Sequence, residues 1–361
     1  MKFGKTLTEL AVELDRREKV KKDYLVDTSL MVMDASPNNA ILSIHNDKTG
    51  NTLMLNINEV AHNQIGTYLN IPASYYDRMR ADNPELLAQN VNSWFNKNPK
   101  PRMVRTLDGV ARAFLSERYH CIDNFEIAQT VLPIIGEMEG ARIESCEVTD
   151  ERMYLKVVNE RLTTEVVPGD VVQSGILITN SEVGMGSVTI QPLVYRLVCS
   201  NGMVVNDAKV RKYHVGRGNQ AAEDFSLYSD ATLRADDIAL QMKIQDTVRS
   251  VVDQAKFERV VNMMREARNA KITTNNVPKF VEVTSTNFGM TKQEGQGILD
   301  YLIRGGDLTL YGLANATTRY AQDVPSYDRS TKLESLGYDI MGMSPAVWNR
   351  LQNASAEETA A

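Results

Sequence analysis

The sequence predicts an α+β fold, with antiparallel sheets packed with helices, followed by a mainly helical C-terminal region. Three observations predict this class. Short alternating runs rich in β-branched residues are joined by turn signals, helical patterns separate some of these runs, and beyond residue 230 the pattern is helical. At 361 residues the chain is long enough for two domains, because single cores stop growing near roughly 250–300 residues.

Residues 1–100 are predicted to form an N-terminal α+β region. The first helix spans residues 6–22, with Thr6 or Thr8 as its cap and lysines at its end. A small antiparallel meander follows, with strands predicted at residues 30–33, 41–44 and 52–56. Three further helices begin at Asn58, Pro72 and Asn83-Pro84. We expect these helices to cover one face of the meander.

Residues 101–220 are predicted to form an antiparallel β-rich core. Its first element is a hairpin that turns at Asp108-Gly109, a dipeptide favoured in two-residue hairpin loops. A helix over residues 123–138 is expected next. Four strands complete the region, over residues 142–148, 153–158, 175–180 and 187–198.

Residues 221–350 are predicted to be helical. Apolar residues between Asp230 and Ala270 recur on one helix face, which indicates one long helix or two joined helices. A linker from Thr273 to Pro278 leads to the final helices. Residues 351–361 end in small, polar and acidic residues and are predicted to be a disordered tail.

Composition and motifs narrow the classes of function. The net charge of −6 argues against a protein that coats duplex DNA through overall charge, so any nucleic-acid site must be a local patch. No phosphate-binding GxxxxGK, HExxH or GxSxG motif occurs, and the cysteines and histidines are scattered, so no catalytic residue, metal or cofactor is expected. Three dispersed cysteines, no signal peptide and no membrane span predict a protein of the cytoplasm.

Two groups of cations have aromatic neighbours and are the candidate nucleic-acid contacts. Arg105, Arg112 and Arg118 flank the hairpin, with Tyr119 close by. The second group is a glycine-flanked basic loop made of Lys209, Arg211, Lys212, Tyr213 and Arg217. Such a loop can follow a phosphate backbone while its tyrosine stacks on a base. The alternative for the loop is a solvated hairpin arm.

Four motifs resemble those of the domain-of-unknown-function 932 family. They are Glu117-Arg118-Tyr119, Leu177 to Ser181, Arg196 to Met203, and Leu310 to Tyr320. The similarity runs from about Arg112 to Tyr338. It implies a protein of a bacteriophage, plasmid or other mobile element, in a bacterial host and commonly among DNA replication and recombination functions, with its biochemical role largely unassigned.

Within the third motif, Arg196 and Cys199 lie three apart on a predicted strand and should therefore point to opposite faces. Cys199 would then pack inward, while Arg196 would face a groove or an acidic partner. Asn201-Gly202 is expected to supply the turn that ends this strand. Arg196 joins the candidate nucleic-acid contacts on this basis.

Three functional hypotheses follow. The leading one is a non-enzymatic protein that binds single-stranded DNA and assists recombination or replication, as a ring or other homo-oligomer. The second is an interaction factor that binds a host or phage protein, for example to block a defence system. The third is a metal-dependent nuclease that uses Asp123 and Glu126, although that spacing also suits an ordinary helix start.

Overall fold

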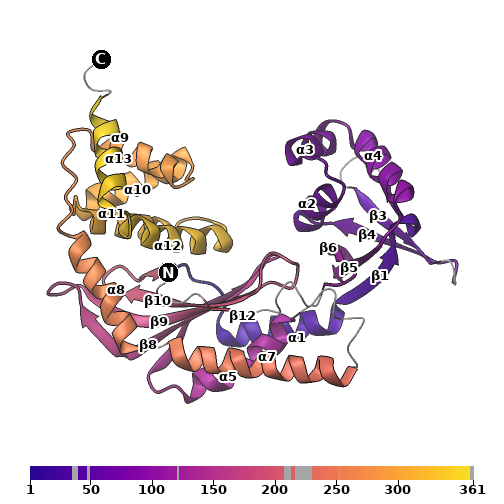
Figure 1. The fold of residues 1–361 in the computed structure, drawn as a ribbon, viewed down its shortest axis with the longest axis horizontal. Coiled ribbons are helices and arrows are strands. Elements are labelled where there is room, and N and C mark those ends of the chain that lie inside the picture. Colours follow the sequence, from indigo (N-terminus) through magenta and orange to yellow (C-terminus); the bar gives the residue numbers. More distant parts are fainter. Residues whose placement is uncertain are drawn as a thin grey trace.

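A computed structural model describes residues 1–34, 40–46, 49–119, 122–206, 213–215, 230–251 and 253–357. These residues form two six-stranded sheets and a set of helices, and the C-terminal part is mainly helical, so the predicted α+β class is confirmed. Figure 1 shows a U-shaped arrangement. The first sheet and its helices form one arm, the last helices form the other, and the second sheet forms the base.

The first sheet has the strand order β1-β5-β6-β4-β3-β2. Its strands are β1 (Lys22–Asp27), β2 (Met31–Asp34), β3 (Ile41–His45), β4 (Thr52–Ile57), β5 (Pro101–Leu107) and β6 (Val110–Ser116). The 3-10 helix η1 (Thr28–Leu30) joins β1 to β2. One face packs against α2 (Glu59–Tyr68), α3 (Ala73–Asp82) and α4 (Pro84–Lys97). The predicted meander is confirmed, as are the helix starts, with Asn58 and Asn83 capping α2 and α4.

The hairpin between β5 and β6 turns at the predicted dipeptide. Asp108 and Gly109 both have positive φ, 50° and 76°, as the two-residue turn of this type requires. The strands pair antiparallel with a register shift between Arg105 and Thr106. β6 also pairs in parallel with β4, which places the hairpin inside the first sheet.

The second sheet has the strand order β11-β10-β9-β8-β7, and β12 also pairs with β10. Its strands are β7 (Ala141–Val148), β8 (Met153–Glu165), β9 (Val171–Asn180), β10 (Val188–Arg196), β11 (Asn201–Val204) and β12 (Tyr213–Val215). The lower face in Figure 1 packs on α1 (Leu7–Val20), α5 (Asn124–Glu137) and α7 (Asp230–Val251). Alternate strand residues such as Ile178 and Ile190 point into this lower core.

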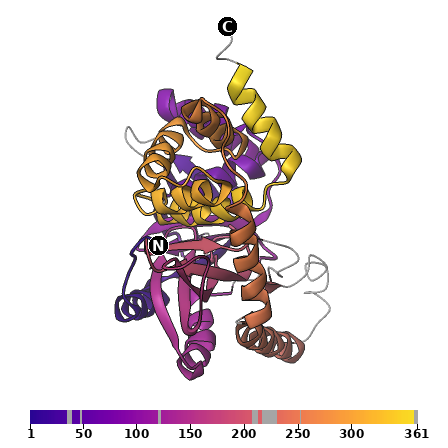
Figure 2. The same cartoon turned by 90° about the vertical axis from the view of Figure 1, so that its left-hand side faces the viewer.

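The remaining helices lie on the upper face of the second sheet or farther from it, in the second arm of the molecule. They are α8 (Gln254–Ala267), α9 (Val277–Asn287), α10 (Lys292–Gly305), α11 (Leu310–Tyr320), α12 (Tyr327–Met341) and α13 (Pro345–Glu357). Figure 2 shows the yellow and orange helices stacked above the magenta strands. Lys156 of β8 and Glu334 of α12 form a fully buried ion pair of 2.7 Å between the two layers. Among the described residues, no helix is long and apolar enough to cross a membrane.

Several sequence-based expectations need correction. Residues 101–116 belong to the first sheet instead of the β-rich core, because β5 pairs with β1, a strand that the sequence analysis did not predict. α1 ends at Val20, and β1 begins at Lys22. Of the two alternatives predicted for residues 230–270, the structure has the second, two helices, α7 and α8. The predicted tail is helical as far as Glu357, since α13 packs Trp348 and Leu351 into the core; residues 358–361 lie outside the described part.

Candidate functional site

Arg105 lies in the interior and not on a nucleic-acid surface. Its side chain is 0% exposed, and its guanidinium donates to Asp23 (2.9 Å), Asp123 (2.8 Å) and the carbonyl of Glu182 (2.8 Å). Asp23 stands opposite Arg105 because β1 pairs with β5. All three nitrogens are thus engaged inside the protein, and the prediction that Arg105 contacts nucleic acid is wrong for this fold.

Arg112 is the second internal arginine. It is 6% exposed, and its Nη1 donates to Glu182 Oε2 at 2.6 Å. The other oxygen of Glu182 accepts the backbone N–H of Asn124 at 2.6 Å, so this carboxylate caps the start of α5 from a distant loop. We call Arg105, Arg112, Asp23, Asp123 and Glu182 the junction cluster, because they join the two sheets. Arg112 is likewise corrected from a surface contact to a structural ion pair.

Asp123 also belongs to this cluster. It is the N-cap residue of α5, but its side chain makes no capping hydrogen bond and instead binds Arg105 and Lys21. Burial opposes ionisation of Asp123, yet Arg105 and Lys21 together hold the pKa of its carboxyl below the ordinary value. Glu126, its supposed partner in a nuclease site, is exposed on α5. The described residues contain no group of three His, Cys, Asp or Glu that could hold a metal, so the geometry gives the nuclease hypothesis no support.

Arg196 and Cys199 lie in contact and not on opposite faces. β10 ends at Arg196, and residues 197–200 form the turn, so the expected turn at Asn201-Gly202 is instead the start of β11. Arg196 Nη1 approaches Cys199 Sγ at 3.3 Å, and its Nε donates to Asp170 at 2.5 Å. Tyr311 of α11 donates to the same carboxylate at 2.8 Å. The expected acidic partner is therefore present, and it belongs to the protein itself.

The other candidate contacts divide into two groups. Arg118 is exposed, with Glu117 4.0 Å away, and the Tyr119 hydroxyl donates to the carbonyl of Ser181 at 3.4 Å. The basic loop falls largely outside the described residues, namely Lys209, Arg211, Lys212 and Arg217. Tyr213 is described only as backbone in β12, which pairs with β10. The described structure therefore brings none of the predicted arginines together on an open surface.

A different set of residues does converge, in two adjoining cavities, one over the second sheet and one over the first. The first, here the α12 pocket, has a volume of about 340 Å³ and lies between the upper face of β8 to β10 and α12. Its floor carries Thr179, Thr189 and Gln191, and its wall carries Asp328, Thr331 and Lys332. Tyr154 of the floor donates to Asp328 at 2.6 Å, which fixes that carboxylate.

The second cavity, here the Arg102 pocket, has a volume of about 450 Å³ and belongs to the first sheet and α2. The Arg102 guanidinium lies over the ring of Tyr68 (4.1 Å) and near that of Phe114 (5.1 Å). Within the described part of the chain Arg102 makes no ion pair, and its buried Nε has no hydrogen-bond partner. Burial lowers the pKa of Arg102 from its ordinary value, but an arginine remains charged.

The two pockets share a lining residue, and we call the pair together the groove. Glu151, in the turn between β7 and β8, lines both of them. Arg152 of the first pocket donates to the backbone carbonyl of Met185, which lines the second. Burial, followed by repulsion from Asp328, raises the pKa of Glu151. A negative charge at the centre of the groove is thus easier to neutralise than an ordinary surface carboxylate.

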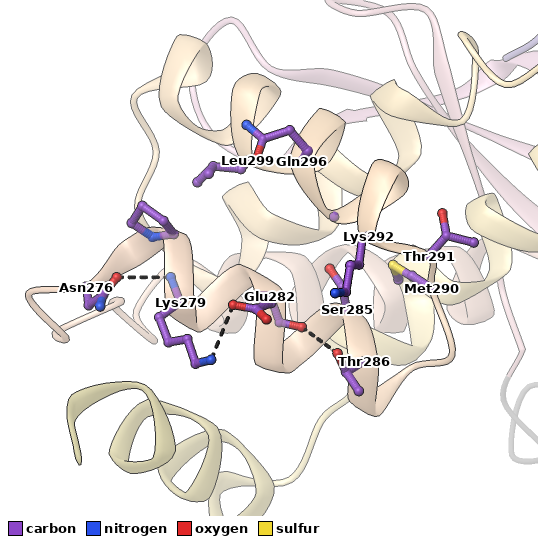
Figure 3. Close-up of a pocket in the computed structure, with 12 residues that line it drawn as sticks. Asn276, Lys279, Glu282, Ser285, Thr286, Met290, Thr291, Lys292, Gln296 and Leu299 are labelled. Atoms are coloured by element: carbon purple, nitrogen blue, oxygen red, sulfur yellow. Dashed lines mark hydrogen bonds and ion pairs between the residues drawn. The ribbon is translucent and has the colours of Figure 1, made fainter. Parts of the chain in front are cut away.

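A larger cavity of about 510 Å³ lies between α9 and α10 (Figure 3). Several of its polar groups bond within α9. Asn276 accepts from the backbone of Lys279 at 3.0 Å, Lys279 pairs with Glu282 at 3.3 Å, and Thr286 donates to the carbonyl of Glu282 at 2.9 Å. The groove is therefore the better candidate, because polar groups that lack internal partners are the ones that a ligand satisfies.

The sequence analysis missed the central residues of the groove, although the sequence contains a signal for two of them, Thr189 and Gln191. Thr189 and Gln191 are polar residues that alternate with Val188 and Ile190 in an otherwise apolar strand, and their exposure is 6% and 8%. Polar side chains at buried positions of an apolar strand mark a site that needs partners. No comparable signal separates Arg102 from Arg105, since both are arginines of the same strand.

Comparison with known proteins gives a family but no activity. The family model described as "Domain of unknown function (DUF932)" matches residues 113–336. A search of the curated proteins and a search of the solved structures each found no match.

Proposed function

The chain belongs to the DUF932 family, whose description names no activity, and we propose that it binds a single strand of nucleic acid along the groove. The observation that carries this proposal is Arg102, a guanidinium with no carboxylate partner among the described residues, held against two aromatic rings at one end of the groove. The proposal keeps the hypothesis of single-stranded nucleic-acid binding but assigns most of the contacts to residues other than those proposed from the sequence.

Arg102 is suited to a phosphate. Tyr68 and Phe114 lie beside its guanidinium, and a guanidinium stacked in this way still has N–H groups at its edge. Those N–H groups can donate to two phosphate oxygens in the planar, two-point geometry that favours arginine over lysine. Arg105 and Arg112 cannot serve in this way, because both side chains are buried in the junction cluster, where carboxylates pair with them.

The rest of the groove supplies polar contacts to a flexible strand. Ser116 and Thr67 lie in the Arg102 pocket, while Lys332 and the polar floor lie beyond Glu151. Cavities of about 340 and 450 Å³ are at the lower end of the range for ligand sites, which suits single nucleotides and not a duplex. Assistance in recombination or replication of a mobile element, in the form of an oligomer, is the role that the family resemblance adds to this proposal.

Fluorescence anisotropy with a labelled single-stranded oligonucleotide, over a salt series, tests the proposal. Arg102→Gln should weaken binding about tenfold, because a hydrogen bond to a charged group contributes about 1.5–3 kcal/mol. It should also reduce the slope of log K against log salt by about 0.7, the value for one phosphate contact on a single strand.

The matched control is Arg78→Gln, an exposed arginine of α3 that does not line the groove. It should leave both affinity and slope unchanged. An oligonucleotide that fails to bind even at low salt would contradict the proposal and leave the interaction-factor hypothesis as the better account.

A further inference from the structure

The floor of the α12 pocket is built from side chains that alternate along β9 and β10. Thr179 and Thr189 face each other across the strand pair, and Gln191 faces Leu177. The intervening residues Ile178 and Ile190 point into the lower core. Strand periodicity therefore fixes Thr179, Thr189 and Gln191 on the side that α12 faces.

These floor residues are buried but lack partners. Thr179 is 6% exposed and Gln191 is 8% exposed, and within the described residues neither the Thr179 hydroxyl nor the Gln191 amide makes a hydrogen bond. Across the pocket, Thr331 of α12 is 8% exposed, and its Oγ1 also has no partner in the described part of the chain. All three groups border one cavity, into which the Thr179 hydroxyl and the Gln191 amide are open, so a ligand bound there can satisfy them.

The chemistry of the pocket selects the kind of ligand. The Gln191 amide offers one acceptor and a donor pair in one plane, which matches the edge of a nucleobase. Asp328 and Glu151 line the same pocket, and an ionised carboxylate only accepts hydrogen bonds. Beside these carboxylates a ligand edge that carries N–H donors is favoured, because a carbonyl oxygen placed there would face another acceptor.

We propose that the α12 pocket receives a single nucleobase that carries an exocyclic amino group, namely adenine, cytosine or guanine, and disfavours thymine and uracil. The Gln191 amide makes hydrogen bonds to the base edge, while the carboxylate of Asp328 accepts one from the amino group. Arg152 at the rim supplies a planar guanidinium on which a base can stack. This inference rests on the proposed function, since the base would belong to the strand whose phosphate meets Arg102.

The size of the pocket agrees with this ligand. About 340 Å³ is near the lower limit for a small-molecule site and accommodates a base with its sugar. The adjoining Arg102 pocket, which shares Glu151, leaves room for the next nucleotides of the strand. Base recognition and phosphate binding therefore occupy separate ends of one groove.

Two binding measurements on the full chain test the inference. Anisotropy with oligo-dA, oligo-dC and oligo-dT of equal length should give at least about fivefold tighter binding of dA and dC than of dT. Gln191→Ala should remove this preference while leaving the affinity for oligo-dT unchanged. Gln173→Ala is the matched control, a glutamine of β9 that is also buried but does not line the pocket, and it should keep the preference.

Equilibrium dialysis with free adenosine and free thymidine separates this inference from the strand proposal. Adenosine should be retained, and Gln191→Ala should abolish its retention. Equal binding of all three oligonucleotides, with no retained adenosine, would overturn the base pocket and leave strand binding intact. Retained adenosine without oligonucleotide binding would support the base pocket and overturn the strand proposal. Failure of every ligand would overturn both.

Discussion

Arginine has opposite roles in the junction cluster and in the groove. Arg105 and Arg102 lie three residues apart on β5. In the junction cluster Arg105 meets two carboxylates and a carbonyl, and nothing remains for a ligand. In the groove Arg102 meets aromatic rings, and among the described residues no carboxylate forms an ion pair with it, although the charge of Glu117 acts on it. The difference teaches that the partners around an arginine, and not its presence near an aromatic residue, determine whether it can bind an anion.

Charged residues in the junction cluster connect parts of the fold, whereas charged residues in the groove are available to a ligand. The junction cluster joins β1, β5, β6, the start of α5 and the loop that contains Glu182. Buried ion pairs of this kind contribute little net stability, but removal of one partner leaves an uncompensated charge. The groove keeps its charges partly hydrated and open to a ligand. Variants in the cluster should therefore alter stability, whereas variants in the groove should alter binding.

The largest effect is expected from Glu182→Gln in the junction cluster. Loss of this charge leaves the Arg112 guanidinium buried without a counter-ion, and should lower the free energy of unfolding by about 3–5 kcal/mol. Chemical denaturation measures this change. Glu139→Gln is the control, because its pair with Arg161 is largely exposed and should cost less than about 1 kcal/mol. Equal, small effects of the two variants would remove the distinction between cluster and surface.

A smaller change in stability is expected from Arg102→Gln. This variant loses a partly exposed cation–π contact, which contributes roughly 0.5–1 kcal/mol, and leaves no carboxylate unpaired. Arg105→Gln, three residues away, should cost several times more, because Asp23 would lose its cation and Asp123 would keep only Lys21. Denaturation curves of the two variants compare the regions directly. An Arg102 variant as unstable as the Arg105 variant would place Arg102 among the structural arginines.

The smallest effect concerns pH and Glu151. Its raised pKa means that the folded protein holds this proton more tightly than the unfolded chain, so its contribution to stability is complete at low pH and declines as pH rises through the folded pKa. Protonation also removes a negative charge from the groove. Oligonucleotide affinity should therefore rise severalfold as the pH is lowered from neutral through the raised pKa of Glu151.

The variant Glu151→Gln tests whether protonation of Glu151 causes this dependence of affinity on pH. The variant should bind oligonucleotide more tightly at neutral pH and should lose most of the dependence on pH. Anisotropy at a series of pH values and constant salt measures both. A wild-type protein whose affinity does not change over this range would show that Glu151 does not face the bound strand.

The contrast between structural arginines and arginines open to a ligand also applies to Arg196 and its motif. The sequence placed this arginine on a strand and its cysteine on the opposite face, but the strand ends at Arg196 and a turn brings Cys199 back to it. Asp170 and Tyr311 complete the contacts, and Asn201 donates to Thr318 of α11. This part of the chain therefore resembles the junction cluster, because its polar groups attach α11 to the second sheet.

Local elements could be read from the sequence because their causes are local. Thr6 and Glu9 form a reciprocal capping box within four residues, and Asp108-Gly109 adopts positive φ through its own residue types. Each of these depends on neighbours in the chain. The α+β class, the hairpin and the helix starts followed from such signals.

Only the tertiary structure decided which cations are free. Arg105 and Asp23 are separated by 82 residues, and Arg112 and Glu182 by 70, so these contacts exist only once the strand order is set. Strand order in turn depends on burial of apolar faces from distant segments, which no short window of sequence contains. For this reason the sequence determined where the helices and hairpins form, while the packing of two sheets determined that Arg105 is internal and that Arg102 faces the groove.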